Sequence, residues 1–249
     1  MKKTDAPFTD MGAMIFAAGL GTRFKPWTDK HPKALAIVNG KPLLQHAIQY
    51  LQKYGIRKVV VNVHHFAEQV IDAIKKNKGW GSEIVISNEE EEVLETGGGL
   101  LKAKDLLKSK RFITINVDIL TDLNLDKFFH HHQQTGSFIS LAIAERKTSR
   151  FLLFNEHNRL CGWRNIKGDD IIEKITMPAS SYVQKAYSGM AIFEPGIFDH
   201  ITMTGKFSVI DVYLQLAQYK IISGYDHTGD KWVDVGRPES VAMAEKLFT

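Results

Sequence analysis

Short apolar runs alternate with segments of helical periodicity along the first part of the chain, up to about residue 146. An apolar run at 13–16 is followed by a segment at 43–54 whose apolar residues recur every three or four positions, and a β-branched run follows at 58–63. Apolar residues at such spacings form one face of a helix, whereas short apolar or β-branched runs are typical of buried strands. This alternation predicts βαβ units on a mainly parallel sheet.

The rhythm of the chain changes after Arg146. Up to that point we expect further helices at 67–76, 100–107 and 125–134 and further strands at 83–87, 112–116 and 138–144. Beyond it, short β-type segments at 151–154, 160–163 and 186–193 are joined by polar connections, before helices return at 209–219 and 238–247. We therefore predict one α/β domain of 249 residues, with a Rossmann-like, mixed but mainly parallel sheet flanked by helices and a small antiparallel addition.

The composition is that of a globular chain with a small positive charge. The net charge of +4 is not concentrated in a run of Lys or Arg, so a nucleic-acid partner is not expected. A single cysteine, Cys161, excludes an internal disulfide and a cysteine-based zinc cluster. The first residues lack the apolar core of a signal peptide, and no run approaches the ~20 apolar residues of a membrane span. We expect a cytoplasmic protein with no membrane partner.

A glycine-containing loop follows the first predicted strand directly. Ligands of open α/β sheets sit beyond the carboxyl ends of the strands, and Gly19 and Gly21 allow backbone N–H groups to approach a phosphate or a base closely. Arg23 adds a fork of donors suited to phosphate oxygens, and Lys33 supplies a second cation after a stiff proline. The alternative is a strand–turn connection in which the glycines serve geometry alone.

Two common nucleotide-binding motifs are absent from this loop. A dinucleotide-binding fingerprint needs a third glycine at position 24, which is Phe24 here. A P-loop needs Ser or Thr after its Gly-Lys pair, but Gly40-Lys41 is followed by Pro42. A different phosphate-binding loop is therefore predicted.

Three further segments bear groups that suit a nucleotide and a metal ion. Glu95 and Thr96 precede a glycine triplet at 97–99 and a predicted helix, where unbonded N–H groups would bind an anion or a base; a flexible hinge is the alternative. Asp118 follows a buried strand and Asp234 precedes a helix. Each aspartate alone could be a helix cap or a turn residue. Together they form the carboxylate pair that Mg²⁺ prefers beside substrate phosphates.

The long loop resembles the signature of the sugar-1-phosphate nucleotidyltransferases. The resemblance rests on Ala17-Ala18-Gly19-Leu20-Gly21-Thr22-Arg23, on Pro26 and Thr28, and on Pro32-Lys33-Ala34-Leu35. It implies a glycosyltransferase-A-like fold, with Arg23 acting on the departing pyrophosphate and Lys33 contacting phosphate. It also implies nucleotide contacts from two segments, at Ala17, Ala18, Gly19, Gly21, Thr22, Glu95, Thr96, Gly97 and Gly98.

Two shorter segments resemble the metal-binding segments of the same family. Asn116-Val117-Asp118 is similar to its Asn-Gly-Asp segment, and the run 232–236 is similar to its Trp-x-Asp-x-Gly segment. The resemblance implies that Asp118 and Asp234 coordinate the catalytic Mg²⁺. One departure is Val117, which stands where the family usually has glycine and would narrow the space beside the metal.

Within the family, the runs at 94–99, 187–190 and 232–239 look most like the N-acetylmuramate-1-phosphate uridylyltransferase branch. This resemblance implies sugar contacts from Asn116, Ser188 and Gly189. It implies a nucleotide-binding part at about 12–146 and a sugar-binding part at about 147–249. The implied substrates are a nucleoside triphosphate, UTP in that branch, and a sugar 1-phosphate, N-acetylmuramate 1-phosphate in that branch; a monomer or a homodimer is expected.

Two alternatives to this reaction stay open. One is a guanylyltransferase for mannose or heptose 1-phosphate. The other, from a different class, is a catalytically silent regulator that binds NDP-sugars, although the presence of Arg23, Asp118 and Asp234 disfavours it. Three polar segments are expected to have no part in catalysis or only a weak one: a solvated acidic loop at 89–92, a solvated helix end at 130–132, and an acid–lysine pair at Glu173-Lys174.

Overall fold

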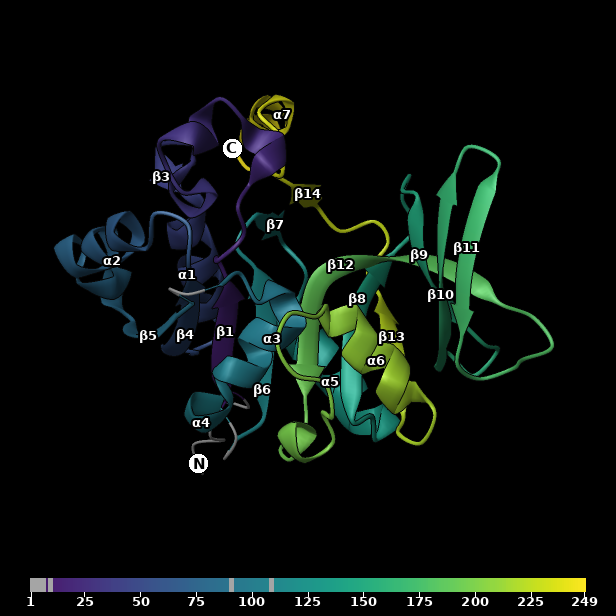
Figure 1. Ribbon diagram of the computed structural model, residues 1–249. Coiled ribbons are helices and arrows are strands. Elements are labelled where there is room, and N and C mark those ends of the chain that lie inside the picture. Colours follow the sequence, from purple (N-terminus) through teal and green to yellow (C-terminus); the bar gives the residue numbers. More distant parts are fainter. Residues whose placement is uncertain (1–7, 9–10, 90–91, 108–109) are drawn as a thin grey trace, which may run out of the picture.

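A twisted, mainly parallel sheet forms the centre of the molecule (Figure 1). The computed structural model describes residue 8 and residues 11–89, 92–107 and 110–249. The strands are β1 (Gly12–Phe16), β4 (Lys58–Val63), β5 (Glu83–Asn88), β6 (Phe112–Asn116), β8 (Ile139–Ala144), β12 (Val183–Phe193) and β13 (Ile222–Asp226). They lie in the order β5-β4-β1-β6-β12-β8-β13, and β12 alone runs antiparallel to both of its neighbours. The predicted fold class is confirmed.

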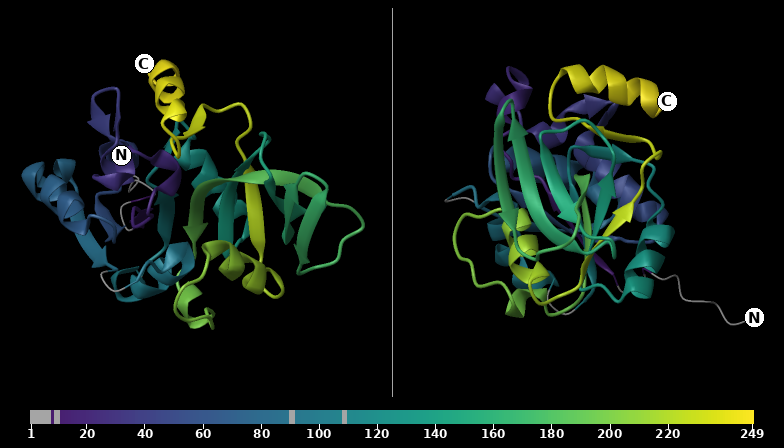
Figure 2. Two further views of the ribbon diagram at one scale, coloured as in Figure 1. Left: turned by 45° about the horizontal axis from the view of Figure 1, so that its top comes forward. Right: turned by 90° about the vertical axis from the view of Figure 1, so that its right-hand side faces the viewer.

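Helices cover both faces of this sheet (Figure 2). They are α1 (Leu43–Lys53), α2 (Ala67–Lys76), α3 (Glu95–Lys102), α4 (Lys104–Leu107), α5 (Leu125–Thr135), α6 (Val209–Ala217) and α7 (Glu239–Leu247). Side chains alternate between the two faces of a strand. In β1, Ala13 and Ile15 join the core under α1 and α5, while Met14 and Phe16 join the core under α3 and α6. Full burial of a side chain such as Ile15 contributes about 1.5–3 kcal/mol.

A smaller antiparallel sheet extends from the long strand β12. It consists of β9 (Arg150–Phe154), β10 (Leu160–Lys167) and β11 (Asp170–Ile175), and the first residues of β12 pair with β9. Figure 1 shows it projecting beyond β8 and β13 on the side away from α2. The predicted antiparallel addition is therefore present, with one strand, β11, that the apolar pattern did not indicate. All six residues of β11 are exposed, which explains why no buried pattern marks it.

Two short strand pairs complete the fold. β2 (Ile37–Val38) pairs with β3 (Lys41–Pro42), and β7 (Ile119–Thr121) pairs with β14 (Trp232–Asp234). The second pair joins segments more than a hundred residues apart, and Asp234 lies opposite Ile119. It thus brings the end of the chain to the edge of the sheet where β6 ends.

The helix expected at 100–107 differs from the structure. Two helices cover this region, and the first, α3, begins at Glu95, so the glycine triplet lies inside a helix rather than before one. Its close packing explains the difference. A Cβ on Gly97 would lie 2.4 Å from the ring of Phe207, and a Cβ on Gly98 would lie 2.3 Å from the carbonyl oxygen of Gly205. The first two glycines of the triplet allow close contact with the segment before α6, and Gly99 allows close contact with Glu89 and Asn62.

Candidate active site

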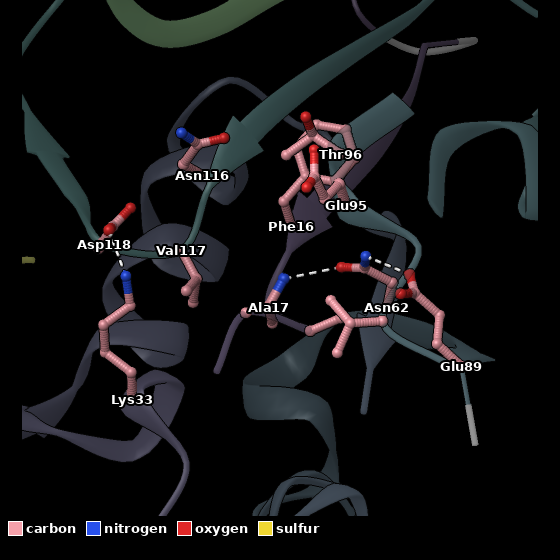
Figure 3. Close-up of a pocket in the computed structure, with 13 residues that line it drawn as sticks. Phe16, Ala17, Lys33, Asn62, Glu89, Glu95, Thr96, Asn116, Val117 and Asp118 are labelled. Carbon is pink, nitrogen blue, oxygen red and sulfur yellow. Dashed lines mark hydrogen bonds and ion pairs between the residues drawn. The ribbon is translucent and has the colours of Figure 1, made fainter. Parts of the chain in front are cut away.

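The loop that follows β1 lines a cavity at the carboxyl edge of the sheet. Phe16 pairs in register with Asn62 of β4 on one side and with Asn116 of β6 on the other. Three strand ends therefore meet at one level, as expected for a ligand site in an open α/β sheet. The cavity, of about 160 Å³, is shown in Figure 3 and is lined by Phe16, Ala17, Ala18, Gly19, Lys33, Asn62, Glu89, Val93, Glu95, Thr96, Asn116, Val117 and Asp118.

A buried network of hydrogen bonds holds the residues at the floor of this cavity in place. The N–H of Ala17 donates to Oδ1 of Asn62 at 2.7 Å, and Nδ2 of Asn62 donates to Oε1 of Glu89 at 2.7 Å (Figure 3). The N–H of Leu94 donates to the other oxygen of Glu89 at 3.0 Å. Glu89 is 1% exposed, so the expectation of a solvated acidic loop is wrong for this residue; residues 90–91 lie outside the described part. These hydrogen bonds connect the ends of β1, β4 and β5.

The start of α3 forms the opposite wall. Glu95 and Thr96, for which nucleotide contacts were predicted, line the cavity. Glu95 has a left-handed φ of 58°, which is uncommon for a residue other than glycine and typical of functional sites. The N–H groups of Gly97 and Gly98, in contrast, both donate to the carbonyl of Phe207, at 2.9 and 3.2 Å. The expectation that these two N–H groups are unbonded is therefore wrong.

Gly21 and Thr22 continue the loop beyond the residues that line the cavity. Gly21 has φ 61°, and the Thr28 hydroxyl donates to its carbonyl at 2.9 Å. A Cβ on Gly21 would lie 2.8 Å from Cγ2 of Thr28, so both the conformation and the contact require glycine. A short helical turn, Thr22–Phe24, then directs Arg23 toward the aspartates described next.

Asp118 and Asp234 are brought together by the pairing of β7 with β14. The N–H of Val235 donates to the carbonyl of Asp118 at 2.8 Å. Nζ of Lys33 contacts Oδ2 of Asp118, and both side chains are largely buried. Arg23 lies 3.9 Å from Asp234 in an exposed ion pair. The four residues assigned to catalysis in the sequence thus form one cluster, although they come from three distant segments.

The environment of Asp234 suits a divalent cation. Its Oδ1 is buried and has no hydrogen-bond partner among the described residues. Burial, followed by the negative charge of Asp118, raises the pKa of the Asp234 carboxyl. A Cβ on Gly236 would lie 2.6 Å from that Oδ1 and 2.6 Å from a guanidinium nitrogen of Arg23. An orphaned carboxylate oxygen beside a second carboxylate fits Mg²⁺, which takes one or two carboxylates together with substrate phosphates.

A second cavity, of about 550 Å³, has Asp234 and Arg23 in its wall. We call it the arginine-lined cavity. The antiparallel sheet, β12, α6 and the C-terminal segment form its wall, through Arg23, Arg146, Thr148, Ser149, Arg150, Phe151, Leu152, Trp163, Tyr187, Ile210, Asp234 and Arg237. It is large enough for a monosaccharide and its phosphate.

The three residues predicted to contact a sugar have different surroundings in the structure. Asn116 lines the first cavity. Gly189 has φ 78° in an irregularity of β12, and a Cβ there would lie 3.0 Å from Nδ2 of Asn116. The Ser188 side chain is fully buried, and its hydroxyl forms a 2.7 Å hydrogen bond with His227. Ser188 is thus engaged with the protein, and its carbonyl accepts the indole N–H of Trp232 at 3.0 Å.

His132 and the pair Glu173-Lys174 both have partners within the protein, away from the proposed catalytic cluster. His132 of α5 is 1% exposed and bonds Ser140 and Glu194, so a solvated helix end is wrong for this residue. Burial lowers its pKa to about 4. Glu173 pairs with Arg164, and Lys174 pairs with Asp211 of α6, so neither joins the cluster of Asp118 and Asp234.

Several site residues were missed in the sequence. Asn62 interrupts a run of four valines in β4, and a lone amide in an otherwise apolar buried strand was a usable signal. Arg146 follows β8 and Arg150 begins β9, with no motif around either. Only the three-dimensional fold gathers them at one cavity.

The fold and the site together define a nucleotidyltransferase, and comparison with known proteins gives the family. The model of the nucleotidyl transferase family matches residues 12–249. The chain belongs to this family.

Known relatives and solved structures agree with this assignment. The chain is 31% identical to N-acetylmuramate alpha-1-phosphate uridylyltransferase of Neisseria meningitidis, over 95% of this chain and 98% of the relative. It is 30% identical to the mannose-1-phosphate guanylyltransferase catalytic subunit beta of Drosophila melanogaster, over 95% of this chain and 62% of the relative. The fold is similar to HddC from Yersinia pseudotuberculosis complexed with GMP-PN, with a TM-score of 0.73, 24% identity, and coverage of 96% and 100%.

A UDP-glucose pyrophosphorylase complexed with UDP-glucose has a similar fold, with a TM-score of 0.75, 20% identity, and coverage of 96% and 98%.

No helix in the described part of the chain has both the length and the apolar character needed to cross a membrane.

Proposed function

We propose that the protein transfers a uridylyl group from UTP to N-acetylmuramate 1-phosphate, giving the UDP-sugar and pyrophosphate. The observation that supports a transfer of this kind is the cluster of Asp118, Asp234, Lys33 and Arg23 between two cavities. Similarity over nearly the full length of a uridylyltransferase supports UTP and N-acetylmuramate 1-phosphate as the substrates. The cytoplasm, where UTP is available, is the proposed compartment.

The proposed reaction is an in-line displacement. An oxygen of the sugar phosphate attacks the α-phosphorus of UTP, a new P–O bond forms, and the bond from the α-phosphorus to the oxygen bridging to the β-phosphorus breaks. The electron pair leaves with pyrophosphate. The phosphate monoester is already a nucleophile, so catalysis consists mainly of positioning and charge neutralisation. Asp118 and Asp234 would hold Mg²⁺, which neutralises phosphate charge and orients the two anions.

Residues of the protein would bind the substrates and neutralise the remaining charge. Ala17, Ala18, Gly19, Glu95 and Thr96 would bind the nucleoside in the first cavity, which they line. Lys33 would contact phosphate while it holds Asp118 in place, and Arg23 would offset the charge that develops on pyrophosphate. Residues 12–146 form the proposed nucleotide-binding part and residues 147–249 the proposed sugar-binding part.

The test is pyrophosphate release with Mg²⁺, for UTP, GTP, CTP and dTTP against the 1-phosphates of N-acetylmuramate, mannose, heptose and glucose. The proposal expects the highest kcat/KM with UTP and N-acetylmuramate 1-phosphate, and loss of turnover on chelation of the metal. Preference for GTP with mannose or heptose 1-phosphate would replace the proposal by the guanylyltransferase alternative, which the Drosophila relative supports. Nucleotide binding without any release would favour the silent regulator.

A further inference from the structure

The arginine-lined cavity has an excess of positive charge that one phosphate does not explain. Arg23, Arg146, Arg150 and Arg237 line it, with Asp234 as the one carboxylate among the described residues of its wall. Arg23 already pairs with Asp234. No carboxylate of the described residues forms an ion pair with Arg146, Arg150 or Arg237, so three guanidinium groups of the wall have no direct ion-pair partner.

Arg146 is the most constrained of these groups. Its guanidinium lies over the ring of Trp232, 4.1 Å from the ring centroid, and donates to the carbonyl of Tyr187 at 2.6 Å. Its Nε is buried and has no hydrogen-bond partner among the described residues. Burial lowers the pKa of this guanidinium, although Asp234 opposes the shift. A cation buried this far is costly unless an anion compensates it.

The spacing of β14 places Trp232, on which Arg146 lies, beside Asp234 on one face of the strand. Trp232 and Asp234 are two residues apart on one strand, so their side chains project from the same face about 7 Å apart. Arg146, which lies over the ring of Trp232, is close enough to Asp234 for their charges to interact but forms no ion pair with it, so a sugar whose phosphate lies beside Asp234 could also reach Arg146. Arg150, at the start of β9, lines the same cavity. These two arginines are placed to meet the part of the sugar that is remote from its phosphate.

We propose that the acceptor is an acidic sugar 1-phosphate and that Arg146 and Arg150 bind its carboxylate in the arginine-lined cavity. The inference rests on the proposed function and narrows its substrate class. N-acetylmuramate fits, because its lactyl ether carries a carboxylate that is ionised at neutral pH. Mannose and the neutral heptoses lack such a group and would leave both guanidinium groups unpaired.

The test uses two acceptors that differ only in the lactyl ether that carries this carboxylate, N-acetylmuramate 1-phosphate and N-acetylglucosamine 1-phosphate. The wild-type protein should favour the acidic acceptor. Arg150→Gln and Arg146→Gln should each lower kcat/KM for the acidic acceptor by about 10- to 100-fold, mainly through KM, and change the neutral acceptor much less. Arg146→Lys, which keeps the charge but loses the fork, should fall between wild type and Arg146→Gln.

Lys167→Gln is the matched control, because Lys167 is an exposed cation on β10 outside the cavity lining. Arg146→Gln also removes a contact with Trp232, so the folding of this variant is checked by circular dichroism. Arg150 is exposed, so Arg150→Gln is expected to leave the fold unchanged. Equal loss for both acceptors in the Arg146 and Arg150 variants would overturn the inference, and so would equal kcat/KM of the wild type for both.

Binding separates this inference from the proposed reaction. With Mg²⁺ and a non-hydrolysable UTP analogue present, calorimetric titration should show the wild type binding the acidic acceptor at least about tenfold more tightly than the neutral one. Equal affinities would overturn the acidic-sugar inference even if pyrophosphate is released with other acceptors. Selective binding without turnover would contradict the proposed reaction and leave the acidic-sugar site supported.

Discussion

The two cavities beside Asp118 and Asp234 are built by different means. The first is formed by the carboxyl ends of three neighbouring strands, β1, β4 and β6, and by the segments that follow them. The arginine-lined cavity is formed by β9, β10, β12 and α6, with residues that are scattered along the chain. Local sequence motifs therefore mark the first cavity, while the second depends on antiparallel pairing between distant segments.

On the proposed function, the two cavities also divide the phosphate transfer from the choice of acceptor. A parallel sheet presents its loops at a fixed edge, which suits a reaction whose nucleotide has an invariant phosphate chain. The antiparallel sheet can vary its side chains without moving that edge. We expect changes in the first cavity and at the aspartates to abolish turnover or stability, and changes in the second to redirect it.

The largest effect is expected at the junction of the two cavities. Asp118→Asn keeps the shape of the side chain but removes a negative charge from the proposed Mg²⁺ site, so kcat should fall by about 1000-fold, or about 4 kcal/mol of transition-state stabilisation. Pyrophosphate release measures it, with circular dichroism to check the fold. Asp169→Asn, an exposed carboxylate in the turn before β11, is the control, and full activity in Asp118→Asn would remove this residue from the mechanism.

The hydrogen-bonded floor of the first cavity should control stability. Asn62→Ala leaves the N–H of Ala17 and the buried carboxylate of Glu89 without their partner, and should lower the free energy of unfolding by about 3 kcal/mol. Urea denaturation measures this. Glu89→Gln keeps an acceptor for Asn62 and should cost less. If the free energy of unfolding falls by the same small amount in both variants, the hydrogen bonds between the ends of β1, β4 and β5 do not stabilise the fold.

Two glycines of the first cavity's segments should behave differently. Gly97→Ala would place its Cβ 2.4 Å from the ring of Phe207, and such overpacking should cost about 2 kcal/mol. Gly19→Ala meets no atom within 4 Å and should leave the free energy of unfolding nearly unchanged while it weakens UTP binding. Thermal unfolding and nucleotide titration of both variants make the comparison. Equal stability of the two would contradict the packing role of the triplet.

The smallest effect is expected from His132, which lies outside both cavities at the opposite edge of the sheet. Its neighbours include Glu194, Arg111 and His131. Burial lowers its pKa in the folded protein to about 4, against about 6.5 in the unfolded chain. Because the unfolded state then binds more protons below pH 6.5, stability should fall as the pH falls, by about 1 kcal/mol between pH 7 and 5.5.

His132→Gln tests this assignment, because it removes the titrating group while a side-chain amide can still bond Ser140 or Glu194. The unfolding free energy of the variant should depend less on pH over this range than that of the wild type. The same slope in both proteins would assign the pH dependence to other groups.

The sequence was informative wherever burial imposes a pattern. The strand at 58–63 and the helix at 67–76 were predicted with the bounds that the structure has. The strand is a run of mostly apolar residues, and the helix has one apolar face. The loop with Gly19, Gly21 and Arg23 and the aspartates at 118 and 234 were found because their spacing is local or resembles a family signature.

The remaining features depend on contacts between distant segments. β11 is exposed along its length, and its isoleucines, Ile171, Ile172 and Ile175, do not alternate as they would in a half-buried strand. The pair β7–β14 is three residues long and joins positions near 120 and 233, which no local window relates. A charged or polar run predicts exposure, and the sequence therefore predicts that Glu89 and His132 are solvated. Their burial depends on partners, Asn62 for one and Glu194 for the other, that only the fold brings near.

We propose that the chain joins a uridylyl group, bound at the first cavity, to an acidic sugar phosphate, bound at the second. The most direct test is one competition mixture with equal amounts of UTP, GTP, CTP and dTTP, and of N-acetylmuramate, N-acetylglucosamine, mannose and heptose 1-phosphates, analysed by mass spectrometry after partial conversion. The account predicts UDP-N-acetylmuramate as the main product. A GDP-sugar, or a UDP-sugar made chiefly from a neutral acceptor, would contradict it.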